Sequence, residues 1–269
     1  MQMFSLPCNV HSAPEVKKLI ICFAGWSMDE KPFLHMMNHQ YDVVIFYDYT
    51  TFRFNGCSEA NCLAQIVTSK CLIYNLFNKY NEIHIIAWSM GVWGASMAFN
   101  QYFETLCHIG QTSHGKLLKK LKHCIAINGT LFPISTTWGI PQDIYDKTLE
   151  NLPAGFNKFN LRMCGGKNAY EKYMACAPTR SIDNMKDELA AIRDHFILCN
   201  SLKWDTAIIS TNDHIFPAKS QRTFWEDYLA STPNSQNPYF ERDKFRIIEI
   251  EDAHYPFFRW NTWDEIIEL

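Results

Sequence analysis

The sequence lacks several features that define large classes of proteins. Its 269 residues carry a formal net charge of only -3, with neither a basic excess nor a long acidic tail. Nucleic-acid-binding proteins usually carry a strong basic field, so we expect no nucleic-acid partner. The N-terminus has no basic stretch followed by an apolar core and a small-residue cleavage site, so we expect no secretion signal.

Long hydrophobic runs are also missing. The most apolar stretch, residues 83–99, has 17 residues and is interrupted by His84 and Ser89, whereas a membrane-spanning helix needs about 18 apolar residues or more. The ten cysteines form no C-x-x-C pair, and several lie in apolar runs where a thiol acts as a small core residue. We therefore expect no membrane partner, reduced cysteines and a cytoplasmic location.

What the sequence does contain is a regular alternation of strands and helices. Hydrophobic residues make up 47% of the chain, which is enough for one substantial core. The predicted strands cover residues 17–25, 41–49, 82–88, 122–129, 204–211 and 244–251, and predicted helices cover 62–80 and 91–103. This order predicts an α/β fold, with a mostly parallel sheet and helices on both faces.

The strand rhythm stops between residues 138 and 200. We therefore predict a core formed by residues 1–137 and 201–269, with a helical insertion at 138–200. Within it, Ser181 can cap a helix whose apolar face carries Ile182, Met185, Leu189, Ile192 and Phe196. Such an insertion is a candidate lid, and an ordinary pair of crossover helices fits the periodicity equally well.

Ser89 lies between a predicted strand and a predicted helix, in the stretch A-W-S-M-G. A serine hydroxyl becomes a good nucleophile only when a base takes its proton. The turn called the nucleophile elbow holds such a serine clear of the sheet, and its strain requires small residues two before and two after. Ala87 and Gly91 meet this requirement, although the usual pattern has glycine at the first position. The pattern alone is weak, and its place between strand and helix makes Ser89 the candidate nucleophile.

A nucleophile of this kind is followed along the chain by an acid and then by a histidine. Asp213 lies in the turn after the strand at 204–211, and His254 follows the strand at 244–251. Both positions are at the carboxyl ends of strands, where parallel sheets hold their sites. The residue types leave two alternatives open, with His214 as the functional group or Asp252 as the acid.

Stabilisation of a tetrahedral intermediate also requires two backbone N–H groups that point at its negative oxygen. Met90, which follows the candidate nucleophile, is one expected donor. The loop after the first predicted strand supplies the other, because Gly25 allows a tight turn and Trp26 offers its N–H. Gly25 fits an ordinary strand-ending turn as well.

Five segments carry a resemblance to a known family. The chain resembles the BioG type of pimeloyl-acyl-carrier-protein methyl ester esterases of bacterial biotin synthesis in F-A-G-W-S-M-D-E, A-W-S-M-G-V-W, L-R-M-C-G-G-K-N-A-Y, S-T-N-D-H-I-F-P and D-A-H-Y-P-F-F. The functionally equivalent BioH type usually has H-G-W and G-W-S-x-G. Ala24 and Ala87 depart from those motifs and favour the BioG type.

The resemblance implies an α/β-hydrolase fold and a serine esterase. The reaction would be hydrolysis of the methyl ester of pimeloyl-acyl carrier protein, without a metal or an organic cofactor. By carry-over, Ser89 would be the nucleophile, His254 the base and Asp213 its orienting acid, with Trp26 and Met90 as oxyanion donors. A general short-acyl carboxylesterase or thioesterase is the alternative, and a non-catalytic binding protein is disfavoured by the intact Ser, Asp and His.

The resemblance also implies an acyl carrier protein as partner. Such proteins are strongly acidic, so basic residues of the region 138–200 are expected to receive one, with Arg162 and Arg180 as the candidates. An ordinary solvated helix face, balanced by neighbouring acidic residues, explains these charges equally well. Trp26 and Trp88 flank the candidate site as possible walls of a substrate pocket, and core packing is the alternative for both.

Overall fold

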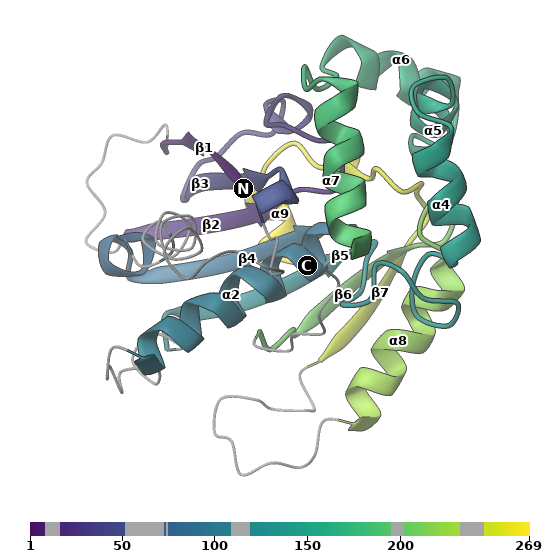
Figure 1. The fold of residues 1–269 in the computed structure, drawn as a ribbon. Coiled ribbons are helices and arrows are strands. Elements are labelled where there is room, and N and C mark those ends of the chain that lie inside the picture. The colour runs from purple at the N-terminus through teal and green to yellow at the C-terminus, as the bar shows by residue number, and fades with distance from the viewer. Residues whose placement is uncertain (9–16, 52–72, 74, 109–118, 195–201, 232–244) are drawn as a thin grey trace.

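The centre of the protein is a seven-stranded sheet, seen in the computed structural model in Figure 1. The structure describes residues 1–8, 17–51, 73, 75–108, 119–194, 202–231 and 245–269. The strands are β1 Gln2–Leu6, β2 Lys18–Phe23, β3 Asp42–Tyr47, β4 Glu82–Trp88, β5 Leu121–Ile127, β6 Thr206–Ser210 and β7 Arg246–Ile250. They are ordered β1-β3-β2-β4-β5-β6-β7 across the sheet.

All neighbouring strands from β3 to β7 are parallel, which confirms the predicted α/β fold. The six predicted strands are all present, each within a few residues of its expected bounds. β1 was not predicted, and it pairs antiparallel with β3 at the edge of the sheet. Its five residues are exposed or half-buried, so it lacks the continuous apolar run that marks the buried strands.

Successive strand residues point to opposite faces of the sheet, and each face has its own core. On one face, residues such as Ile21 and Ile85 pack with buried side chains of two flanking helices, Gly91–His108 (α2) and Ala218–Ser231 (α8). On the other face, Ile20 and its neighbours pack with the C-terminal segment. Burial on both faces explains why the central strands are almost entirely apolar.

Four helices follow one another between β5 and β6, and Figure 1 shows them grouped together. They are α4 Gln142–Glu150, α5 Phe156–Met163, α6 Lys167–Ala175 and α7 Ile182–Asp194. The hydroxyl of Ser181 accepts a 3.2 Å hydrogen bond from the N–H of Asn184, as expected for the N-cap of α7. Residues 195–200, with Phe196 of the predicted apolar face, lie outside the described residues.

The remaining elements are short. They are the helix α9 Asp264–Ile267 and the 3-10 helices η1 Lys31–Phe33, η2 Tyr49–Thr51 and η4 Phe257–Arg259. Of the helix predicted at 62–80, residues 73 and 75–79 are helical, and residues 62–72 and 74 lie outside the described part of the chain. Within the described ranges, every helix is too short or too polar to span a bilayer.

Candidate active site

Ser89 sits in a sharp turn between β4, which ends at Trp88, and α2, which begins at Gly91. Its backbone is in the left-handed region, with φ of 57°, a conformation that costs a non-glycine residue free energy. A Cβ at Gly91 would lie 2.1 Å from the carbonyl oxygen of Phe23, so only glycine fits where the helix meets the end of β2. The turn therefore has the strain and the close packing expected of a nucleophile elbow.

The structure brings Ser89, His254 and Asp213 into one hydrogen-bonded series. His254 Nε2 lies 2.9 Å from Ser89 Oγ, and His254 Nδ1 lies 2.7 Å from Asp213 Oδ2. All three side chains are nearly inaccessible to solvent, with whole-residue exposures of 4%, 2% and 7% for Ser89, His254 and Asp213. This geometry allows His254 to accept the serine proton while Asp213 holds the imidazole in place.

Asp213 is held as a hydrogen-bond acceptor on both carboxylate oxygens. Oδ1 accepts from the backbone N–H groups of Ile215 and Phe216 at 2.9 and 2.8 Å, and Oδ2 accepts from the Gln221 amide at 2.9 Å. An ionised carboxylate can only accept hydrogen bonds, so Nδ1–H of His254 donates to Asp213. The other ring nitrogen, Nε2, then carries the lone pair that faces Ser89.

The structure separates Asp213 from the two alternatives that the sequence left open. His214 is exposed, and its carbonyl accepts a hydrogen bond from Arg162. The Asp252 carboxylate accepts from the N–H of Ala253 at 2.9 Å and from Arg259 at 3.2 Å. Neither residue contacts the His254 imidazole through a described hydrogen bond, so Asp213 is the acid that meets the histidine.

Sequence reasoning missed two supporting residues: Asn128 holds the backbone of His254, and Gln221 holds the carboxylate of Asp213. The Asn128 amide donates to the His254 carbonyl at 3.0 Å and to Ser210 Oγ at 2.8 Å. Asn128 has a positive φ of 48°, and asparagine directly after a strand and before glycine is a residue that tolerates this conformation. Gln221, bound to Asp213, has no comparable signal because it lies in an ordinary amphipathic pattern within α8.

The loop after β2 lies directly beside the nucleophile. A Cβ at Gly25 would lie 3.0 Å from the Trp88 ring and 3.2 Å from Ser89 Cβ, so the backbone here packs closely against the elbow. Trp26, the next residue, and Met90 both line the same pocket. The two residues expected to supply the oxyanion donors thus line one pocket.

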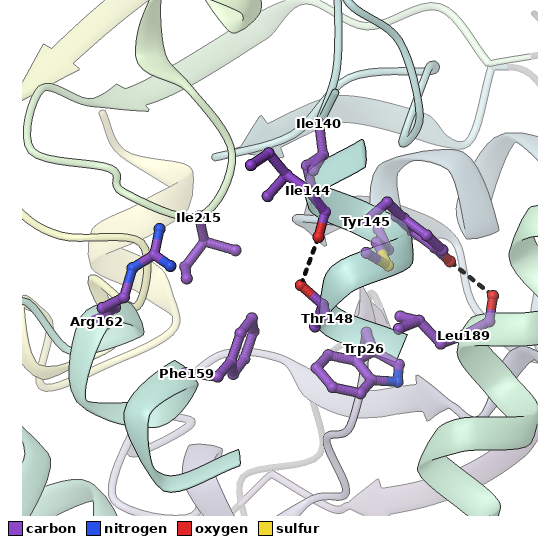
Figure 2. Close-up of a pocket in the computed structure, with 10 residues that line it drawn as sticks. Trp26, Ile140, Ile144, Tyr145, Thr148, Phe159, Arg162, Leu189 and Ile215 are labelled. Atoms are coloured by element: carbon purple, nitrogen blue, oxygen red, sulfur yellow. Dashed lines mark hydrogen bonds between the residues drawn. The ribbon is translucent and has the colours of Figure 1, made fainter. Parts of the chain in front are cut away.

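That pocket has an empty volume of about 390 Å³, which includes its open mouth, and Figure 2 shows the side chains that surround it. Its walls are mostly apolar, with Arg162 as the single charged side chain among them. The lining residues are Trp26, Met90, Ile140, Ile144, Tyr145, Thr148, Phe159, Arg162, Leu189 and Ile215. Trp26 packs edge-on against Phe159, with 5.1 Å between ring centroids.

Two residues expected to bind substrate have other environments. Trp88 does not line the pocket: it is 1% exposed, packs among Phe33, Tyr255 and Phe257, and donates its indole N–H to the His254 carbonyl. Core packing therefore describes Trp88, whereas Trp26 both packs in the core and lines the pocket.

Arg180 corrects a second expectation. Its side chain is only 6% exposed and forms a 2.8 Å ion pair with Glu188, so it is not available to an incoming protein. Electrostatic attraction of an acidic partner requires an exposed cation, and Arg180 was expected to be one because it is among the basic residues of the region 138–200. Arg162 is exposed and lines the pocket, and its substrate-binding role stays a prediction. Among the described residues, no group of three or more His, Cys, Asp or Glu is placed to hold a metal ion.

Comparison with known proteins agrees with this fold. The model of the family described as "Pimeloyl-ACP methyl esterase BioG" matches residues 70–235. The crystal structure of BioG from Haemophilus influenzae superposes with a TM-score of 0.68 at 26% identity and covers 98% of this chain and 99% of that chain. A lipase-esterase related protein from Clostridium acetobutylicum has a TM-score of 0.57 at 14% identity, with 94% and 93% coverage, and shows the fold alone.

A longer relative is also similar. Malonyl-[acyl-carrier protein] O-methyltransferase from Bacteroides fragilis is 36% identical over 225 residues, which are 82% of this chain. The chain spans only 39% of the length of that protein.

The sheet topology and these likenesses define a carboxylic ester hydrolase of the α/β-hydrolase class. Within that class, the chain belongs to the pimeloyl-ACP methyl esterase BioG family.

Proposed function

We propose that this protein hydrolyses the methyl ester of pimeloyl-[acyl-carrier protein] to pimeloyl-[acyl-carrier protein] and methanol, as a step of biotin biosynthesis. The observation that carries the proposal is the buried series of hydrogen bonds from Asp213 through His254 to Ser89. The family description supplies the substrate. Free thiols are found at Cys8, Cys22, Cys124, Cys164 and Cys176, which fits the proposed cytoplasmic location.

The proposed mechanism is acyl transfer through the serine. His254 Nε2 takes the proton of Ser89 as its oxygen adds to the ester carbonyl carbon, and the tetrahedral intermediate collapses as His254 returns the proton to departing methanol. Water then enters, loses a proton to His254 and attacks the acyl enzyme. The second collapse returns the proton to Ser89 and releases the free carboxylate, so each step balances without a cofactor.

Trp26 and Met90 would stabilise both tetrahedral intermediates. Their backbone N–H groups belong to the two segments that meet beside Ser89, and fixed donors of this kind act where the negative charge develops. Removing one such donor typically slows turnover by about 10² to 10³-fold. The oxyanion role of the two residues follows from their position next to the nucleophile and in the loop that packs on it.

The pocket has the chemistry of the proposed substrate. Its apolar walls suit the methylenes of a pimeloyl chain, and Arg162 supplies one cation that suits the anionic arm and acidic surface of a carrier protein. Seven of the ten lining residues belong to the region 138–200, so we propose that this region is the lid that encloses the substrate. The name of the Bacteroides relative, an O-methyltransferase acting on malonyl-[acyl-carrier protein], supports a methyl ester on a carrier protein as the substrate.

A general short-acyl carboxylesterase or thioesterase is the second candidate, because the same three residues serve all these reactions. The test compares kcat/KM for methyl pimeloyl-acyl-carrier protein with kcat/KM for a short chromogenic ester. A strong preference for the carrier-protein substrate is expected. Equal or better turnover of the short ester, with Ser89 still reactive, would reject methyl pimeloyl-acyl-carrier protein as the substrate. The assignment as a serine esterase would then still stand.

A further inference from the structure

The loop after β2 is bound along its length by one segment of the helical region. We name residues 25–29 the oxyanion loop, because Trp26 is the proposed oxyanion donor. The Trp26 indole N–H donates to the carbonyl of Met185 at 2.7 Å, and the backbone N–H of Ser27 donates to the Glu188 carboxylate at 3.2 Å. Both acceptors belong to α7, which is about 160 residues away in sequence.

The next two residues of the oxyanion loop continue this pattern. The carbonyl of Met28 accepts from the Arg180 guanidinium at 3.0 Å, and the carboxylate of Asp29 accepts from the N–H of Thr179 at 2.8 Å. Four consecutive loop residues are therefore bonded to residues 179–188. A loop held at every residue keeps one conformation, which is the condition for a preorganised oxyanion hole.

Glu188 is the central group of this contact. Its carboxylate is completely buried, and it accepts hydrogen bonds from the backbone N–H groups of Ser27 and Tyr49 and from Arg180. Burial raises the pKa of Glu188, and the Arg180 guanidinium and the two N–H groups favour its ionised form. A buried acid whose two oxygens accept from two backbone N–H groups and one paired cation is an anchor for the chain that donates to it.

The anchored backbone is strained. Ser27 has a positive φ of 69°, and Asp48, which precedes Tyr49, has a positive φ of 63°. Non-glycine residues keep this conformation only where neighbouring contacts hold it. The Ser27 N–H belongs to the peptide that follows Trp26, so the carboxylate fixes that peptide while Met185 fixes the Trp26 indole. With both held, the backbone at Trp26 has little freedom to rotate.

We propose that Glu188 is a positioning residue of the esterase, which sets the oxyanion loop through the N–H of Ser27 and so makes transition-state stabilisation depend on α7. This inference rests on the proposed oxyanion role of Trp26. The proposal also distinguishes α7 from the other helices of the region. α7 must stay fixed to hold the oxyanion loop, whereas α4, α5 and α6 are free of this requirement.

Glu188→Gln tests the proposal. Glutamine keeps the shape and removes the charge. Its single acceptor oxygen cannot replace both carboxylate oxygens, of which Oε1 accepts from Tyr49 and Oε2 accepts from Ser27 and Arg180. The matched control is Asp187→Asn, which removes a negative charge from the adjacent, exposed position of α7. Turnover of a short chromogenic ester is measured per active site, after titration of the reactive serine, so partly unfolded protein does not enter the rate.

The second reading is the inhibition constant of a trifluoromethyl ketone. The Ser89 oxygen adds to the ketone carbon, its proton goes to His254, and the carbonyl electron pair becomes an oxyanion, so affinity reports the oxyanion hole directly. We expect Glu188→Gln to lower kcat/KM and ketone affinity together by about 10 to 100-fold, with KM almost unchanged and Asp187→Asn like the unmodified protein.

Kinetics and ketone affinity within twofold of the Asp187→Asn control would overturn the proposal. If Glu188→Gln does not fold, Trp26→Phe decides by the same two readings, because it removes the bond to Met185 without placing a charge in the core. Loss of ketone affinity in that variant supports the positioning of the oxyanion loop by α7, and unchanged affinity rejects it. Both readings use a short ester, so failure of the carrier-protein substrate would reject the proposed function and leave this result intact.

Discussion

The indole N–H of Trp88 donates a 2.8 Å hydrogen bond to the backbone carbonyl of His254, 166 residues further along the chain. Trp88 directly precedes Ser89, the proposed nucleophile. The same residue therefore also holds the backbone of His254, the proposed base. The Trp88 ring lies beside the His254 imidazole, with 5.3 Å between centroids. The distance from Ser89 to His254 therefore depends on the packing of one buried tryptophan.

Trp88→Phe should reduce kcat about tenfold and leave KM nearly unchanged. Phenylalanine keeps most of the aromatic packing and removes the hydrogen bond, whose net contribution to stability is about 1 kcal/mol. The matched control is Trp204→Phe, because the buried Trp204 indole N–H has no hydrogen-bond partner among the residues that the structure describes. Steady-state kinetics and urea unfolding measure the two effects. A kcat equal to that of the control would contradict the positioning role.

Ser89→Ala and Ser89→Gly should both abolish ester hydrolysis with the fold intact, and the glycine variant should be the more stable by about 1 kcal/mol. This order is the reverse of the usual one, because the left-handed φ of 57° costs alanine free energy that glycine avoids. Thermal unfolding and a serine-reactive probe check the prediction. Substantial residual turnover in either variant would exclude Ser89 as the nucleophile.

Asp213→Asn should lower kcat by about 10⁴-fold, because an amide in place of the carboxylate leaves the His254 imidazole in the wrong tautomer. Asp252→Asn is the control, and its effect should stay within a few-fold because its carboxylate contacts Ala253 and Arg259 instead. Circular dichroism establishes that both variants fold. The reverse order of effects would make Asp252 the functional acid.

Arg162→Glu should lower kcat/KM for methyl pimeloyl-acyl-carrier protein more than for a short ester. Exposed charges act mainly on the rate of association and are screened over about 10 Å at 0.1 M salt, so the loss should be largest at low ionic strength. The control is Lys17→Glu, which makes the same charge change at an exposed position. Lys17 directly precedes β2, at the amino end of that strand. Equal losses on both substrates would show that Arg162 serves the pocket alone.

His84 should make the protein less stable at mildly acidic pH. Burial lowers the pKa of His84, against the opposing effect of its hydrogen bond to Glu82. Because the folded state prefers the neutral imidazole, its contribution is present above the unfolded pKa of about 6.5 and is lost as the pH falls towards the folded pKa, by about 1.4 kcal/mol for each unit of difference.

The test for His84 compares unfolding free energies of the unmodified protein and His84→Gln between pH 7.5 and pH 5. The charged and titratable groups near His84 are Glu82, Lys18, His123 and Tyr41, and all remain in the variant. We expect the advantage of the unmodified protein over the variant to shrink as the pH falls. A constant difference across this range would show that His84 titrates alike in both states.

The sequence by itself determined the positions of the six central strands along the chain and the place of the candidate nucleophile. Both depend on local chemistry: continuous apolar runs mark strands that are buried on two faces, and Ala87 and Gly91 leave the space that a strained serine requires. The edge strand β1 was not predicted from the sequence. Only buried strands have a strong apolar pattern, and the side chains of β1 are exposed or half-buried.

The tertiary structure decided which acid meets the histidine, which tryptophan lines the pocket and which arginine is exposed. Asp213 and Asp252 both follow strands, and only the contact between β6 and β7 sets the turn after β6 against His254. Arg180 and Glu188 look like a solvated helix face in the sequence, yet they are buried because α7 packs on the oxyanion loop. Contacts between residues far apart in the chain, 41 positions for Asp213 and His254 and 161 for Ser27 and Glu188, have no local pattern, so folding alone brings them together.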